Sequence, residues 1–328
     1  MQLAIRKTMI KKTVFLTILF LLTATFVINI SGQETPKKVL KTIVIDPGHG
    51  GIDHGAKGIF STEAQVSLDV SLKLGKAIEK EFPDIKIVYT RTTDVVPGGG
   101  TKDEGLRYRA DLANRSGGDL FIAIHCNAAP PISHREFTGY KTATVYVGKG
   151  KKRRKVTKKV RQYRYWYTQN PAIGTETYIW ASSKTDAKVN SMAKNNDYYG
   201  EIDSTSTISV PDPSDPVEKA RMLIYTQNYF RKSLMFADLI EKGFQAQGRT
   251  YRGGVKQRND KGIWVLQATG MPSILIEIGF ISNKEEEEYI NSENGQNEIV
   301  SNIMSALKNY KHSLESKALP AEGQKKPF

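Results

Sequence analysis

The chain has 328 residues, of which 39% are hydrophobic, and it contains a single cysteine. This length and apolar content are sufficient for one large folded domain, so wholesale disorder is excluded. One cysteine also excludes an intramolecular disulfide framework and a cysteine-rich zinc module. The net charge of +14 is unevenly distributed, because four basic residues precede residue 31 and ten lie in Lys149–Arg164, which has no acidic residue. The rest of the chain is electrically balanced.

The amino-terminal segment is an apolar run, Thr13–Ile30, that follows the four basic residues and precedes the small residues Ser31 and Gly32. This pattern predicts a secretory signal peptide over residues 1–32 and export to the periplasm or cell envelope. An uncleaved membrane anchor is the alternative, although a run of 18 residues barely reaches spanning length. In both cases we expect the bulk of the chain to lie outside the cytoplasmic membrane.

From residue 40 onward, short β-branched runs alternate with amphipathic helical patterns. This alternation predicts an α/β fold with a twisted, mostly parallel sheet flanked by helices. The expected strands are Thr42–Ile45, Ile85–Thr90, Leu120–Ile124, Thr175–Trp180, Ile263–Gln267 and Ser273–Ile278. The expected helices begin near Thr62, Glu104 and Pro216, and a last one carries Ile299, Ile303, Ala306, Leu307 and Tyr310 on one stripe.

Two stretches interrupt the alternation. One is the basic run, whose simplest interpretation is a solvated loop. The other is a polar segment followed by a long helix, which Ser214 or Asp215 can cap and which Gly243 is suited to end. We therefore expect one catalytic domain, 40–313, with a basic insertion, 149–167, a helical insertion, 182–242, and a flexible tail, 314–328.

Three metal-compatible side chains lie where strands end or helices begin. His49 follows the first strand in a glycine-rich turn, and His125 ends the strand Leu120–Ile124. Ligands bind at the carboxyl edge of such sheets, so we expect both histidines in one crevice. Glu63 opens the next helix and completes a His₂Glu set, one of the recurrent ligand sets of catalytic zinc. Each residue alone has a simpler structural explanation, and only their convergence favours a zinc site.

A fourth side chain, Glu277, directly follows the buried strand run Ser273–Ile276. A buried carboxylate without a partner is costly, and a role as the base that takes a proton from water would explain it. Asn127 shares the strand face of His125, so we expect it to orient substrate. Cys126 lies between them and points to the opposite face, which predicts a packing role.

Four motifs occur in a fixed order, DPGHGGIDHGAKG, STEAQVSLDVSLKLGKAIE, LRYRADLANRSGGDLFIAIHCNA and GVKQRNDKGIWVLQATGMPSILIEIGFISN. Together they resemble the zinc-dependent N-acetylmuramoyl-L-alanine amidases of the amidase-3 type over roughly residues 40 to 310. The resemblance implies that His49, Glu63 and His125 hold Zn²⁺ and that Glu277 is catalytic. It also implies hydrolysis of the peptidoglycan amide between N-acetylmuramic acid and L-alanine, for cell-wall remodelling or daughter-cell separation.

Arg107 and Arg109 occupy family-like positions, although a solvated helix face explains them equally well. The helical insertion, 182–242, lies where some related amidases carry a helix that blocks the zinc until an activator protein displaces it, so we expect autoinhibition. A part in the architecture of the substrate groove is the alternative. The basic run, 149–164, has no equivalent in the family pattern. Its expected target is an anionic wall or membrane surface, and not nucleic acid, because the chain is expected to be exported.

Two other functions fit parts of the same pattern. One is a zinc peptidase that cuts within the stem peptide. The other is a catalytically inactive peptidoglycan-binding protein that has kept the fold and lost the metal, although the presence of all four site residues argues against it.

Overall fold

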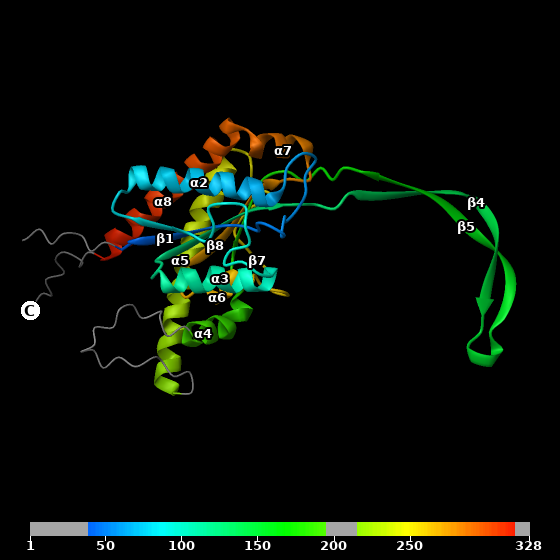
Figure 1. Cartoon of the computed structure of the whole chain (residues 1–328), viewed down its shortest axis with the longest axis horizontal. Helices are drawn as coiled ribbons and strands as arrows, with labels where there is room; N and C mark the ends of the chain where they lie inside the picture. The colour runs from blue at the N-terminus through cyan, green and yellow to red at the C-terminus, as the bar shows by residue number, and fades with distance from the viewer. Residues whose placement is uncertain (1–38, 195–214, 319–328) are drawn as a thin grey trace, which may run out of the picture. The chain divides into compact units, whose positions relative to one another are not determined.

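A mixed sheet of six strands forms the centre of the fold (Figure 1). The computed structural model describes residues 39–194 and 215–318, of which residues 39–314 form one unit. In chain order the strands of this sheet are β1 (Thr42–Pro47), β2 (Lys86–Tyr89), β3 (Leu120–Asn127), β6 (Glu176–Ile179), β7 (Lys256–Gln257) and β8 (Ser273–Phe280). Their spatial order is β2-β1-β3-β8-β6-β7, and only β6 and β8 pair antiparallel. The expectation of a mostly parallel sheet is confirmed.

Helices cover both faces of the sheet. They are α2 (Glu63–Glu81), α3 (Lys102–Arg115), α4 (Thr185–Lys194), α5 (Pro216–Ala246), α6 (Trp264–Ala268), α7 (Lys284–Asn291) and α8 (Glu293–Ala318). One apolar core joins α2, α5 and α8 to strand residues such as Ile45, Ile122 and Ile276. A second, smaller core joins α3 and α6 to Val44, Phe121 and Leu275, which alternate with those residues. The sheet and the helices on its two faces thus form three layers.

The connections around β1 create a crevice at one edge of the sheet. From β1 the chain passes through α2 to β2 on one side, and from β2 it passes through α3 to β3 on the other side. Helices α2 and α3 belong to different cores, so they cover opposite faces. Such a reversal leaves an opening at the carboxyl ends of the two central strands. His49 follows β1 and His125 lies near the end of β3, so both reach this opening.

One expected strand is a helix. Ile263–Gln267 was expected to be extended, but Trp264–Ala268 forms α6. A short apolar run fits either state, and tertiary contacts decide between them. The Lys188 ammonium donates to Leu266 O at 2.6 Å, and the Asn114 amide donates to Ala268 O at 3.0 Å. These donors come from α4 and α3, so no local pattern reveals them.

Helix α5 begins as expected and ends later than expected. Asp215 caps it by accepting from Val217 N at 2.8 Å, and Pro216 occupies its first turn. The helix continues through Gly243 to Ala246. A Cβ at position 243 would lie 1.7 Å from Oδ1 of Asn302 on α8. Gly243 therefore allows two helices to approach closely and does not end the helix.

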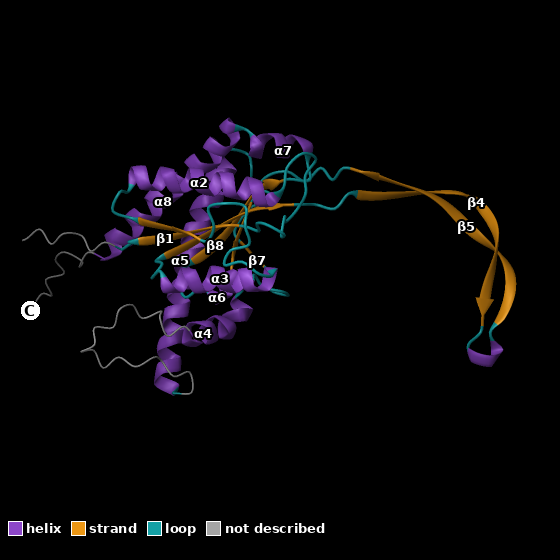
Figure 2. Ribbon diagram, in the orientation of Figure 1, coloured by secondary structure: helices purple, strands orange, loops and turns teal. Residues whose placement is uncertain are grey.

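The basic run is part of an ordered hairpin and is not a loop. Strands β4 (Ile132–Val147) and β5 (Arg154–Thr168) pair antiparallel with each other in a separate two-stranded sheet (Figure 2). A short 3₁₀ turn, Gly150–Lys152, connects them. Threonine, valine and aromatic residues alternate with basic ones along β5, a composition that suits an exposed strand.

Three expectations concern residues outside the described ranges, at least in part. The predicted signal peptide, 1–32, and part of the helical insertion, 195–214, are not described, nor are residues 319–328 of the expected tail. Residues 314–318 of that tail belong to α8. Among the described residues, no helix has the length and apolar character needed to cross a membrane.

A buried carboxylate fixes the loop that precedes Glu63. Glu287 on α7 is fully buried and accepts from the backbone N–H groups of Ile59, Phe60 and Ser61 at 2.7, 2.9 and 2.8 Å. The Ser61 hydroxyl donates to it as well, at 2.8 Å. Burial acts to raise the pKa of Glu287, but these donors outweigh burial and lower the pKa below its ordinary value. This one side chain thus holds the entry to α2.

A buried ion pair fixes the loop that carries His49. Arg109 is 4% exposed, and its guanidinium pairs with Asp46 at the end of β1. It also donates to Pro47 O at 2.7 Å and to the carbonyl oxygen of His49. The interpretation of Arg109 as a solvated residue is therefore wrong, whereas Arg107 is indeed exposed.

We expect Glu287→Gln to lower the free energy of unfolding by about 1.5–3 kcal/mol near pH 7, because hydrogen bonds to a charged acceptor are lost. The lowered pKa means that the carboxylate stabilises the fold above pH 4.5 and that this contribution disappears as the pH falls through the folded-state pKa. Urea unfolding of both proteins at several pH values measures the difference. A difference that stays constant below pH 4.5 would contradict this account.

We expect Arg109→Met to lower the free energy of unfolding by about 3–5 kcal/mol, since it leaves the buried Asp46 carboxylate without its cation. Arg107→Met is the matched control, because it makes the same change two residues away on the exposed face of α3 and should have little effect. Denaturant unfolding compares the two. Equal stability losses would show that the ion pair does not anchor the loop.

Candidate metal centre and cleft

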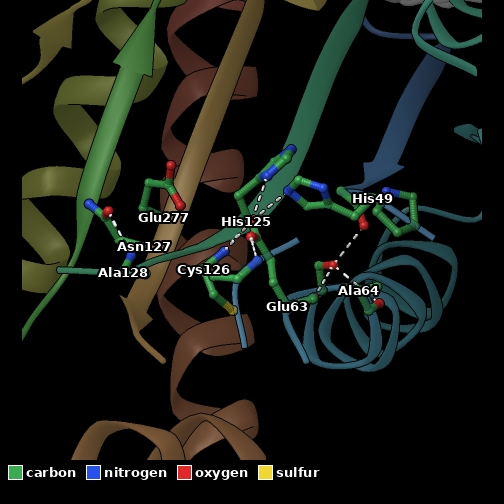
Figure 3. A network of polar contacts seen from close by, with 12 residues as sticks. His49, Glu63, Ala64, His125, Cys126, Asn127, Ala128 and Glu277 are labelled. Atoms are coloured by element: carbon green, nitrogen blue, oxygen red, sulfur yellow. Dashed lines mark hydrogen bonds and ion pairs between the residues drawn. The ribbon is translucent and has the colours of Figure 1, made fainter. Parts of the chain in front are cut away.

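The three predicted ligands converge at the carboxyl edge of the sheet (Figure 3). His49 comes from the loop after β1, Glu63 is the first residue of α2, and His125 lies near the end of β3. One potential ligand atom from each lies within 4.8 Å of those of the other two. Oε1 of Glu63 is 3.1 Å from Nε2 of His49 and 2.8 Å from Nδ1 of His125. The sequence-based trio is therefore a spatial cluster.

Glycine residues make room for this cluster. A Cβ at Gly48 would lie 2.5 Å from the His125 ring, and one at Gly55 would lie 2.5 Å from Oε2 of Glu63. His49 itself has a φ of 59°, which is uncommon for a residue other than glycine. Nδ1 of His49 lies 2.9 Å from Oδ2 of Asp53, an interaction that turns Nε2 toward Glu63.

The charges of the cluster suit a cation. Burial acts to raise the pKa of Glu63, but hydrogen bonds and charges from His125 and His49 outweigh it and hold the pKa far below its ordinary value. Burial acts to lower the pKa of His49, and the carboxylates of Glu63 and Asp53 reverse this and raise the pKa. Glu63 is thus ionised, which is the form that binds a metal.

The donor set fits zinc. Two imidazoles and one carboxylate are a recurrent ligand set of catalytic zinc sites. A carboxylate hydrogen-bonded to the other nitrogen of a ligating histidine, as Asp53 is to His49, is also typical of such sites. Within residues 39–194 and 215–318, this is the one group of three or more histidine, cysteine or acidic side chains with suitable spacing.

Glu277 lies beside the cluster without a full set of partners. It pairs in register with His125 on the neighbouring strand and is 7% exposed. Its Oε2 atom has no hydrogen-bond partner among the described residues, and Oε1 is 3.7 Å from Nη2 of Arg258. Burial raises the pKa of Glu277 to about 8, the Glu63 charge adds to this effect, and Arg258 opposes it. A buried polar atom without a partner needs an explanation, and a part in the chemistry of the neighbouring cluster is one.

A cleft of about 380 Å³ opens over these four residues. Asn127 lines it, as expected, and its amide donates to Oε2 of Glu176 at 2.6 Å. Cys126 is 3% exposed and packs in the apolar core around α2 and α8, which confirms the packing role. Three cations, Lys102, Arg109 and Arg258, also line the cleft.

Three residues that shape the site are not evident from the sequence alone. Asp53 is four residues after His49 in the same glycine-rich loop, a spacing that could have suggested a partner. Arg258 is part of the last quoted motif, but only the fold brings it to Glu277. Glu287 is more than 220 residues from the loop it holds, and no local signal reveals it.

Comparisons with known proteins agree with this geometry. A family model described as N-acetylmuramoyl-L-alanine amidase matches residues 43–309. The chain is 26% identical over 273 residues to N-acetylmuramoyl-L-alanine amidase AmiC of Escherichia coli O6:H1, covering 82% of this chain and 52% of that protein. It is 34% identical over 123 residues to the germination-specific N-acetylmuramoyl-L-alanine amidase of Bacillus subtilis, covering 36% of this chain and 50% of that protein. The chain thus spans about half the length of these curated relatives.

A solved structure shows the same fold. It is the CwlD amidase from Clostridioides difficile in complex with the GerS lipoprotein, with a TM-score of 0.52, 21% identity, and coverage of 83% of this chain and 99% of that chain. The family match covers most of the described fold and includes His49, Glu63, His125 and Glu277. The chain therefore belongs to the N-acetylmuramoyl-L-alanine amidase family whose model it matches.

Proposed function

We propose that the protein is a zinc-dependent amidase that hydrolyses the peptidoglycan amide between N-acetylmuramic acid and L-alanine. One observation carries the proposal. His49, Glu63 and His125 converge beside the buried, incompletely bonded carboxyl of Glu277, in a chain of the amidase family. The three converging residues form the metal site of this proposal, and Glu277 is its catalytic residue.

His49, Glu63 and His125 would hold the zinc ion, which would supply a Lewis acid for the carbonyl of the scissile amide. Glu277 takes a proton from the attacking water as its oxygen bonds to the carbonyl carbon. It then delivers the proton to the leaving nitrogen of L-alanine as the C–N bond breaks. A pKa of about 8 leaves Glu277 largely protonated near neutral pH, and a nearby divalent cation favours its ionised, basic form.

The remaining lining of the cleft suits an acidic peptide. Lys102 and Arg258 supply positive charge, and stem peptides carry free carboxylates. Asn127 is proposed to orient the substrate beside Glu277. A zinc peptidase that cuts within the stem peptide is the main alternative, because the same residues serve any amide. An inactive peptidoglycan-binding protein is less compatible with the intact four-residue set.

We expect Glu277→Gln to lower the rate of release of stem peptides from purified sacculi by at least about 100-fold, because the proton-transferring carboxyl is lost. Zinc content per chain should stay unchanged, since Glu277 is not one of the three metal-binding residues. Glu288→Gln, an equivalent change at an exposed position, is the control and should keep the parent rate. Product chromatography and metal analysis measure both quantities.

The identity of the products separates the alternatives. The amidase releases stem peptides with a free L-alanine amino terminus, whereas a peptidase leaves L-alanine on the glycan. Treatment with a chelator should abolish release, and added Zn²⁺ should restore it. Release that persists in Glu277→Gln, or products without free L-alanine, would contradict the proposed reaction.

We further propose that residues 1–32 direct export to the periplasm or cell envelope, where peptidoglycan is accessible. The AmiC relatives of Escherichia coli and Neisseria meningitidis carry the amidase name, which implies work on the same polymer. In this proposal the catalytic domain extends over 40–313. Its basic insertion, 149–167, contacts an anionic component of the envelope.

Regulation by an activator protein is proposed for the helical insertion, 182–242. The amidase with a similar fold that was solved in complex with a lipoprotein supports the idea of a partner. Helices α4 and α5 do not contribute residues to the lining of the cleft. Residues 195–214 of the insertion lie outside the described ranges.

We expect replacement of residues 195–212 by a short glycine-serine linker to raise the rate of sacculus hydrolysis at least severalfold, because a segment that blocks the cleft is removed. The control inserts the same linker at the exposed Gly117, in the turn between α3 and β3, and should leave the rate unchanged. Timed release of stem peptides is the measurement. Equal rates for the shortened and parent proteins would refute autoinhibition.

A further inference from the structure

The hairpin formed by β4 and β5 has two chemically different faces. Directly opposite residues in an antiparallel pair share a face, and the register pairs Phe137 with Tyr163 and Arg135 with Tyr165. Ring contacts confirm the shared face, since Phe137 lies 5.9 Å from Tyr163 and Tyr163 lies 6.3 Å from Tyr165 between ring centroids. We call this the tyrosine-rich face, and its members are Phe137, Tyr140, Tyr146, Tyr163, Tyr165, Tyr167, Arg135, Lys155, Lys159 and Arg161.

The aromatic rings of this face contact water. Tyr140, Tyr165 and Tyr167 are 61%, 58% and 68% exposed. Cross-strand aromatic pairs stabilise a hairpin, and this explains why Phe137 and Tyr163 touch. It does not explain Tyr167, which lies opposite Ser133 and projects beyond the ring cluster. Several exposed rings in one row are typical of a binding surface.

The positive charge of the hairpin is not balanced by acidic residues of the hairpin. Residues 132–168 contain twelve lysine and arginine residues and a single acidic one, Glu136. Glu136 pairs with Arg164 at 2.6 Å on the face opposite to the tyrosine-rich face. The tyrosine-rich face therefore carries positive charge and aromatic rings without any carboxylate. Like charges close together destabilise a strand pair, so an anionic ligand relieves a repulsion that the fold alone leaves in place.

The distribution of side chains argues against insertion into a lipid bilayer. The tip, 148–153, reads Gly-Lys-Gly-Lys-Lys-Arg and has no apolar side chain to bury among lipid chains. The rings of Tyr163, Tyr165 and Tyr167 lie at the other end, near the base. A row of rings followed by cations instead suits a linear polymer that lies along the strands. The faces of sugar rings present C–H groups that pack on aromatic rings, and stem peptides supply carboxylates for the cations.

The base of the hairpin is attached at the catalytic cleft. Strand β4 starts five residues after Asn127, which lines the cleft, and β5 leads into Glu176, which accepts a hydrogen bond from Asn127 at 2.6 Å. The Asn170 amide donates to Pro130 O at 3.1 Å and links the two connecting segments. A polymer bound in the cleft thus lies next to the aromatic end of the hairpin.

We propose that the tyrosine-rich face is a second binding site for peptidoglycan, which holds a part of the glycan strand and its acidic peptides away from the amide being cut. This inference rests on the proposed amidase function. A strand of 16 residues spans roughly 50 Å. A monomeric muramoyl peptide is far shorter, so it occupies the cleft alone, whereas a long strand contacts both sites.

Sedimentation with purified sacculi tests the proposal in the Glu277→Gln background, which leaves the polymer intact. Replacing Tyr165 and Tyr167 together by alanine should weaken binding about tenfold, because two stacking rings are lost. Trp166→Ala, which removes the ring between them on the opposite face, is the control and should change binding little. Circular dichroism checks that both variants fold.

A second pair of variants has identical net charge. Lys155→Gln with Lys159→Gln changes the tyrosine-rich face, and Arg154→Gln with Lys158→Gln changes the opposite face. The first pair should lose severalfold more sacculus binding than the second, and high salt should reduce the gap. Equal losses from the two faces, or unchanged binding in the tyrosine variant, would overturn the proposal.

Two further measurements separate the outcomes. The first measures binding of the same variants to vesicles of phosphatidylglycerol and to single-stranded DNA. If the tyrosine variant loses binding to either of these ligands but keeps its binding to sacculi, the assignment to peptidoglycan is overturned. Cleavage of a monomeric muramoyl peptide by the chain with Glu277 intact reports on the cleft alone. Absence of that cleavage together with tyrosine-dependent sacculus binding would reject the amidase function and leave the binding surface supported.

Discussion

The parallel register of β1, β3 and β8 is the constraint on which the site depends. Because the strands run in the same direction, Pro47 pairs with Ile124 and His125 pairs with Glu277 at a single edge of the sheet. Side chains that are up to 228 positions apart in the chain then line one cleft. A shift of one residue in either pairing would turn His125 or Glu277 toward the opposite face and into an apolar core. The buried strands that enforce this register therefore act as part of the active site.

Buried charged side chains position the loops that the strand register alone does not fix. The sheet positions the ends of the strands, but the loops beyond them need their own supports. Arg109 holds the loop of His49 through backbone carbonyl groups, and Glu287 holds the loop that leads to Glu63 through backbone N–H groups. Each of these side chains satisfies several backbone groups at once. Two charged side chains that are distant in sequence thus fix a cluster in which neither is a predicted metal ligand.

Much of the fold and the cluster could be predicted from the sequence, because they follow from local patterns. Continuous apolar runs mark the buried strands, and a histidine or glutamate at the end of such a run is exposed to the crevice. The sequence left the role of Arg109 open, because a helical pattern shows which residues share a face but not which neighbouring element buries that face. Helix α6 was misjudged because its carbonyl groups are satisfied by Lys188 and Asn114 from other helices. The hairpin was misjudged because its cross-strand ring contacts depend on pairing.

Cys126 has a consequence for the chemical durability of the protein. It is the single cysteine of the chain, is buried among apolar side chains, and lies next in sequence to His125. Burial, with added repulsion from Glu63, Glu277 and Glu286, raises the pKa of its thiol well above the usual value. The reactive thiolate is therefore scarce, and oxidants or electrophiles have little access to it. A thiol with these properties is protected from sulfenic acid formation and from disulfide-linked dimerisation.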